Sequence, residues 1–191
     1  CYTYSDTIEI IGLPKIINNI LSPDQEICYA QIPEKIIGET PLNGLGTGTY
    51  TYYWQVKTDE KIVCLTFDDG PIPGLTDEIL AILEKFDAKA TFFCVGENVK
   101  RYPDIYSHIL AAGHSTGNHT HHHLKGWTTN NNEYLDDVRE AAQYIDSDLF
   151  RPPYGLMSYR QAKALIRDFK VVMWSVLTKD YDPAVGNEEC L

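Results

Sequence analysis

The sequence lacks any apolar run that approaches the ~20 residues needed to span a bilayer, and it has no charged start followed by a short apolar core, the pattern of a secretory leader. We therefore expect no transmembrane segment. Positive charge is also scarce, because 16 lysines and arginines face 27 acidic residues and the formal net charge is -11. Since that charge repels phosphate backbones and no stretch is rich in Lys or Arg, we expect no nucleic-acid partner.

Cysteine and histidine are distributed unevenly. The five cysteines show no C-x-x-C spacing and cannot all pair, so the sequence predicts no disulfide framework. Five of the six histidines lie within residues 113–123, and none follows His123. With 191 residues, 43% of them hydrophobic, the chain is long enough for one main globular domain.

Two adjacent carboxylates follow the apolar run at residues 61–65. We interpret this run as a buried strand that sends Val63 and Leu65 into a core and presents Asp68 and Asp69 at its carboxyl end, where a Gly-Pro pair turns the chain. Neighbouring like charges are costly unless a cation or an arginine compensates them. The pair therefore predicts a metal-binding or catalytic site.

The histidine-rich segment offers partners for such a site. His119 and His123 are four residues apart, so one helical turn or a tight loop would direct both rings at one point. Imidazole and carboxylate together suit zinc, and one Asp with two His would leave a fourth position for water. Taken alone, the same run is typical of solvated surface histidines or of a loop that scavenges metal.

Three short motifs stand out along the chain. Residues 66–70 read T-F-D-D-G, residues 119–123 fit H-[ST]-x-x-H, and residues 150–155 read F-R-P-P-Y-G. In sequence and in order, these motifs resemble those of the polysaccharide deacetylases of carbohydrate esterase family four. The resemblance covers about residues 50–191 and is greatest to short bacterial members.

The resemblance implies a role for each matched residue. Asp69, His119 and His123 would be ligands of a divalent metal, for which we expect zinc. Asp68 would be the general base that takes a proton from a metal-activated water. Arg151 would pair with Asp68 and favour its ionised form.

The resemblance also implies an oxyanion site and an acid. The backbone N–H of Tyr154 would stabilise the oxyanion. The family's acid is a histidine in a later L-x-H motif, and this sequence has no histidine there. The residue that orients this acid is changed as well, since Leu177 stands where relatives carry an acidic residue. Either Asp180 takes its place or the acid is tuned differently in this subgroup. The alternative acids are the other histidines of the metal segment, His114, His121 and His122, which lie on the wrong side of the expected site.

Strand-like and helix-like segments alternate from residue 61 onward, which is typical of α/β proteins with parallel sheets. We expect strands at 61–67, 90–95, 149–151 and 170–176 and helices at 76–86, 103–112, 132–145 and 158–168. The candidate catalytic groups each follow a strand, where barrel enzymes build their sites. Together with the resemblance, this predicts a distorted, incomplete (β/α) barrel.

We expect two regions along the chain. Residues 1–49 form an N-terminal segment of strands and loops that matches no family, and residues 50–191 form a catalytic domain that lacks its C-terminal strand. We interpret the chain as a C-terminally shortened form that binds metal but turns over slowly.

The expected function is metal-dependent removal of N-acetyl groups from the sugars of a chitin-like or peptidoglycan polymer, so that the expected partner is an acetylated polysaccharide or oligosaccharide. Two alternatives stay open: an O-acetyl esterase of the xylan type, and a glycan-binding relative without activity. We expect such a protein at the bacterial cell envelope or outside the cell, with the cytoplasm as the alternative.

Overall fold

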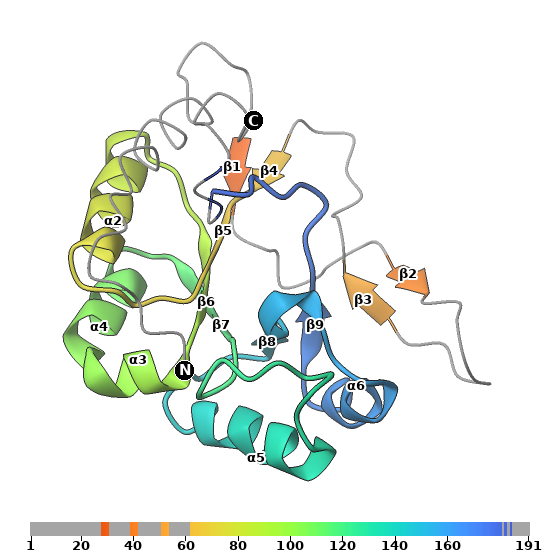
Figure 1. The fold of residues 1–191 in the computed structure, drawn as a ribbon. Coiled ribbons are helices and arrows are strands. Elements are labelled where there is room, and N and C mark those ends of the chain that lie inside the picture. The colour runs from red at the N-terminus through yellow and green to blue at the C-terminus, as the bar shows by residue number, and fades with distance from the viewer. Residues whose placement is uncertain are drawn as a thin grey trace.

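The computed structural model describes residues 28–30, 39–41, 51–53, 62–180, 182 and 184. Its centre is a curled sheet of seven strands in the order β2-β3-β9-β8-β7-β6-β5 (Figure 1). Neighbouring strands from β3 to β5 run parallel, while β2 is antiparallel to β3. Within the described residues the sheet does not close, because its edge strands β2 and β5 do not pair with each other. The expected α/β architecture with an incomplete barrel is therefore confirmed.

The strands are short. They are β1 (Cys28–Ala30), β2 (Glu39–Pro41), β3 (Thr51–Tyr53), β4 (Ile62–Cys64), β5 (Thr66–Asp68), β6 (Thr91–Cys94), β7 (Ser115–Asn118), β8 (Leu149–Phe150) and β9 (Lys170–Val172). The helices are α2 (Leu75–Lys85), α3 (Gly96–Arg101), α4 (Pro103–Ala111), α5 (Asn131–Ala141), α6 (Tyr159–Leu165) and the single turn η1 (Pro153–Gly155).

Local sequence signals explain where the helices begin. The side chain of Asn130 accepts a hydrogen bond from the N–H of Asn132 and caps α5. Ser158 and Gln161 form a reciprocal capping box at the start of α6. In α2, acidic residues occupy the first turn and a lysine the last, as the helix dipole favours.

Hydrophobic residues pack on both faces of the sheet. One cluster joins β6 to helices α2, α3 and α4, and a second joins β8 and β9 to α5 and α6. A third, smaller cluster contains Phe93, Leu149 and Val172, whose neighbours in the strands point to the opposite face. Figure 1 shows the helices wrapped around the outside of the curl, so this third cluster lies within it.

The predicted strand at 61–67 is divided in two. β4 pairs with β1 in a separate two-stranded sheet, whereas β5 pairs with β6 in the main sheet. The prediction that Val63 is buried is wrong, because this residue is 37% exposed. Leu65 and Phe67 do pack against the hydrophobic cluster that includes α2 and α4, whereas Val63 of β4 is not part of this cluster.

Other boundaries differ in detail. The helix α3 was not expected, α5 ends at Ala141 rather than at residue 145, and β9 ends at Val172 rather than at residue 176. No helix in the described part of the chain is long and apolar enough to cross a membrane. Of the N-terminal segment predicted at residues 1–49, only β1 and β2 are among the described residues, and residues 185–191 of the predicted catalytic domain lie outside them.

Candidate active site

The expected site residues gather at the carboxyl edge of the main sheet. Asp68 ends β5 and Asp69 follows it, His119 follows β7, and Arg151 follows β8. Because the carboxyl ends of parallel strands meet at one edge, residues 83 positions apart, such as Asp68 and Arg151, come into direct contact.

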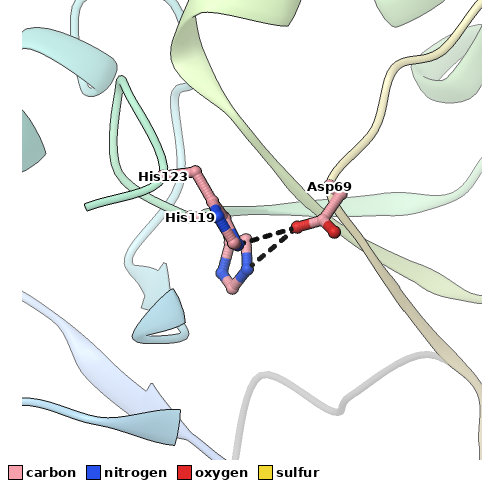
Figure 2. Close-up of side chains that lie close together, drawn as sticks. All are labelled: Asp69, His119 and His123. Carbon is pink, nitrogen blue, oxygen red and sulfur yellow. Dashed lines mark ion pairs between the residues drawn. The ribbon is translucent and has the colours of Figure 1, made fainter. Parts of the chain in front are cut away.

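Figure 2 shows the side chains of Asp69, His119 and His123 converging. Oδ1 of Asp69 lies 3.4 Å from Nε2 of His119 and 3.1 Å from Nε2 of His123. Two ligands of a tetrahedral zinc ion with bonds of about 2.1 Å lie roughly 3.4 Å apart, so these spacings fit a shared ion. The side chain of His119 is 3% exposed, whereas that of Asp69 is 38% exposed. The cluster is therefore walled by protein on one side and open to solvent on the other.

The hydrogen bonds of His119 indicate what belongs between the rings and the carboxylate. Its Nδ1 lies 2.7 Å from the carbonyl oxygen of Arg151, which can only accept, so Nδ1–H donates and Nε2 presents its lone pair to Asp69. Oδ1 of Asp69 is buried and receives no hydrogen bond from the described residues. A lone pair that faces a carboxylate oxygen needs a cation or an added proton between them. These residues thus fit a divalent metal.

The electrostatics of the cluster agree with that requirement. Burial would raise the pKa of the Asp69 carboxyl, but the two imidazoles beside it outweigh burial and hold its pKa well below the usual value. Burial would lower the pKa of His119, but the charges of Asp68 and Asp69 outweigh it and raise this pKa. Both shifts mean that the site favours a positive charge at this position.

Asp68 forms an ion pair with a buried arginine. Nη1 of Arg151 donates to Oδ1 of Asp68 at 2.7 Å and to Oγ1 of Thr66 at 2.8 Å. Its other nitrogens donate to the carbonyls of Val172 and Met173. The side chain of Asp68 is one third exposed, at 33%, while that of Arg151 is 3% exposed. The carboxylate is therefore held in place on one side and accessible to water on the other.

Tyr154 lies next to the metal-ligand cluster. It belongs to η1 and has a positive φ of 60°, which is uncommon for a residue with a side chain. Its ring centroid is 4.8 Å from that of His123, and the side chain is exposed. Its backbone is thus close to the place where a reacting group would meet the cluster.

Asp180 is not brought to the cluster by the described contacts. It is exposed, and its described side-chain partner is the hydroxyl of Thr178, which donates to it at 2.6 Å. Its expected role in tuning an acid stays a prediction. Trp174 is partly buried and packs against the hydrophobic cluster on β8 and β9. Its ring lies 5.7 Å from the Arg151 guanidinium.

The three alternative acids face away from the ligand cluster. His114 is buried, and its Nδ1 accepts the N–H of Ala90 at the other end of the sheet. His121 and His122 contact Glu140 and Asp137 of α5. These contacts agree with the expectation that the three histidines lie on the wrong side of the site.

Sequence reasoning did not identify the residues that support the site. Thr66 was named only as part of a motif, yet it binds Arg151 directly. Asn118 accepts the N–H of Thr120, and Asp137 accepts the N–H groups of His121 and His122. No local pattern could have connected Asp137 to the metal segment, since 15 residues separate it from His122.

The comparisons with known proteins agree with this geometry. The family model described as "Polysaccharide deacetylase" matches residues 55–172, so the chain belongs to the polysaccharide deacetylase family.

A Peptidoglycan-N-acetylglucosamine deacetylase of Bacillus cereus is 34% identical over 167 residues, which cover 80% of this chain and 61% of that protein. Chitin deacetylase 1 of Saccharomyces cerevisiae is 32% identical over 156 residues, which cover 75% of this chain and 50% of that protein. The chain thus covers between half and about three fifths of the length of these two relatives. The crystal structure of the peptidoglycan N-acetylglucosamine deacetylase Bc1960 is similar, with a TM-score of 0.63 and 34% identity over 66% of this chain and 62% of that one.

Proposed function

We propose that this protein is a metal-dependent deacetylase that hydrolyses N-acetyl groups on the sugars of a peptidoglycan or chitin-like polysaccharide. The observation that carries the proposal is the convergence of Asp69, His119 and His123 beside the Asp68–Arg151 ion pair at an open edge of the sheet. The donor set of one carboxylate and two imidazoles favours zinc.

A divalent ion held by these three residues would supply Lewis-acid polarisation of the acetyl group and acidify a nearby water. The carboxylate of Asp68 would serve as the general base toward that water, since it is adjacent to Asp69 and is partly exposed. Arg151 holds Asp68 in one orientation and supplies the opposite charge beside it. The backbone N–H of Tyr154 would donate to the developing oxyanion.

The choice of substrate rests on the relatives. Those named above act, by their names, on N-acetylglucosamine of peptidoglycan and on chitin. Both substrates are neutral or nearly neutral at the acetamide, so the negative charge of this chain does not oppose their binding. Such polymers lie in cell walls, and we propose the bacterial cell envelope or the surrounding medium as the place of action.

The test is acetate release from three substrates by the zinc-loaded 191-residue chain: chitooligosaccharides, N-acetylated peptidoglycan and acetylated xylan. We expect release from at least one of the two N-acetylated glycans, at a low rate because no histidine follows His123 to protonate the amine. In Asp68→Asn the rate should fall by about 100-fold or more. The control Asp104→Asn removes an exposed carboxylate of α4 and should leave the rate unchanged.

Two results would contradict the proposal. Acetate from xylan alone would identify an O-acetyl esterase that uses the same site. Saturable binding of the N-acetylated glycans without acetate from any substrate would identify a glycan-binding protein.

A further inference from the structure

The segment that carries two of the metal ligands is a loop with an unusual backbone. Thr120 and His123 have φ values of 64° and 54°, in the left-handed region that residues with side chains seldom adopt. Such a conformation persists only where the surroundings hold it in place. The loop therefore depends on contacts from outside itself.

The two histidine ligands are held in different ways. The ring of His119 is fixed by the hydrogen bond from its Nδ1 to the carbonyl of Arg151. In the described part of the chain, the ring of His123 has no such hydrogen bond; it forms an ion pair with Asp69 and ring contacts with His119 and Tyr154. The direction of its Nε2 thus follows from the backbone of the loop.

Several contacts hold this backbone. The carbonyls of Thr120 and His121 accept the N–H groups of Gly96 and Glu97, and Asp137 of α5 binds the N–H groups nearest to His123. Oδ2 of Asp137 accepts the N–H of His121 at 2.8 Å and the N–H of His122 at 3.0 Å, and its Oδ1 lies 2.5 Å from Nδ1 of His122. The residue is 6% exposed, so its charge is satisfied by these three donors rather than by solvent. The two N–H groups that it binds belong to the two residues immediately before His123.

His122, Asp137 and Glu140 could also be considered as a second metal site. The spacing argues against it, because two ligands of one ion with bonds of about 2.1 Å lie roughly 3 Å or more apart. The 2.5 Å between Nδ1 of His122 and Oδ1 of Asp137 is instead the separation of a short hydrogen bond, which leaves room for a proton and not for an ion. Asp137 acts here as an acceptor for the loop.

We propose that Asp137 is a positioning residue of the metal site, which aims the ring of His123 by binding the N–H groups of the two residues before it. The inference rests on the proposed metal-dependent function. If it is correct, α5 contributes to metal affinity through Asp137, although α5 provides no ligand.

The experiment measures the zinc affinity of the full chain by competition with a chromophoric chelator. Asp137→Ala should bind zinc about 10- to 100-fold more weakly, the usual effect of losing a residue that orients a ligand. The matched control is Asp136→Ala, which removes the same charge from the neighbouring, 72% exposed position and should change the affinity less than threefold. Asp137→Asn keeps an acceptor oxygen for the peptide groups and should recover most of the loss.

The absorption spectrum of the Co²⁺-loaded protein gives a readout of ligand geometry rather than of stability. Its ligand-field bands should change in Asp137→Ala and remain as in the wild type in Asp136→Ala. If Asp137→Ala does not fold, Asp137→Asn serves as the test variant. It should show a smaller loss of zinc affinity and a smaller change in the same ligand-field bands.

Three outcomes separate the two proposals. Wild-type affinity and spectrum in Asp137→Ala, with binding abolished in His123→Ala, would overturn the positioning role alone. An equal loss in Asp136→Ala and Asp137→Ala would overturn it in favour of charge. Failure of the wild type to bind zinc would overturn the proposed function itself.

Discussion

The guanidinium of Arg151 binds two strands that are not neighbours in the sheet. It donates to Thr66 and Asp68 on β5 and to the carbonyls of Val172 and Met173 at β9, and it lies 4.1 Å from the centre of the Phe93 ring. Three strands separate β5 from β9 along the sheet, so this side chain crosses the inside of the curl. The residue that pairs with the proposed general base, Asp68, thus also connects the two sides of the open barrel.

Replacing Arg151 with lysine should therefore destabilise the fold. A single ammonium cannot reach both strands, so buried acceptors lose their donors, and we expect the free energy of unfolding to fall by about 2–4 kcal/mol. Urea denaturation measures this change. The control Arg139→Lys affects a pair with Asp136 in which both side chains are about 70% exposed, and it should change stability by less than about 0.5 kcal/mol. Equal effects of the two substitutions would contradict the bridging role.

His114 gives the protein a pH-dependent stability that is independent of the metal site. Burial, and to a smaller extent the charge of Lys89, lowers its pKa to about 4. The unfolded chain, with a histidine pKa of about 6.5, then binds more protons than the folded chain between these two values, so stability is lost as the pH falls through this window.

We expect this effect to reach about 1–2 kcal/mol between pH 7 and pH 5. In His114→Asn, the side-chain oxygen can still accept the N–H of Ala90 but does not titrate. The measurement is the difference in urea midpoint between the wild type and this variant at the two pH values, which cancels the titration of the ligand histidines. A difference that does not change with pH would disprove the effect.

At the scale of elements, most of the strands and helices after residue 60 could be predicted from sequence, whereas α3, β7 and the ends of the other elements could not. The apolar periodicity of α2 and the run at β6 were sufficient signals, since nothing else competes for those residues. The strand before the acidic pair was wrong because its division depends on pairing with β1, which is more than thirty residues earlier and carries no local signal.

The same distinction applies to the site. The three ligand candidates and Asp68 could be found because each lies in a short motif. The roles of Thr66 and Asp137 could not, because they arise from contacts between elements that are remote in sequence.

Gly117 lies at a closely packed point of β7, the strand that precedes the loop with His119 and His123. A Cβ at Gly117 would lie 2.5 Å from two ring atoms of Phe93 and 3.2 Å from Cβ of Leu149. Gly117→Ala should therefore displace the inner cluster and lower the free energy of unfolding by about 1–3 kcal/mol. Ser115→Ala, in the same strand and only partly buried, should cost less than about 1 kcal/mol. Thermal denaturation monitored by circular dichroism compares the two, and a similar loss in both would contradict close packing at Gly117.

For the whole molecule, the proposed metal links distant parts of the fold. Its ligands come from the end of β5 and from the loop that follows β7, and this loop is bound to α5 and, through Arg151, to β8 and β9. An ion that binds the folded chain and not the unfolded one must stabilise all of these elements together. Metal binding is thus expected to raise the stability of the described domain as a unit.

Zinc should accordingly raise the melting temperature of the wild type. At a free zinc concentration 100 times the dissociation constant, linkage contributes about 2.7 kcal/mol, or roughly 5–10 °C for a chain of 191 residues. A chelator should reverse the shift, and Mg²⁺ should produce little of it because two of the three ligands are imidazoles. His123→Ala should abolish the shift, while His108→Ala, which removes an exposed histidine of α4, should retain it. If His123→Ala were stabilised by zinc as strongly as the wild type, the ion would bind elsewhere and the link between Asp69, His119 and His123 would be refuted.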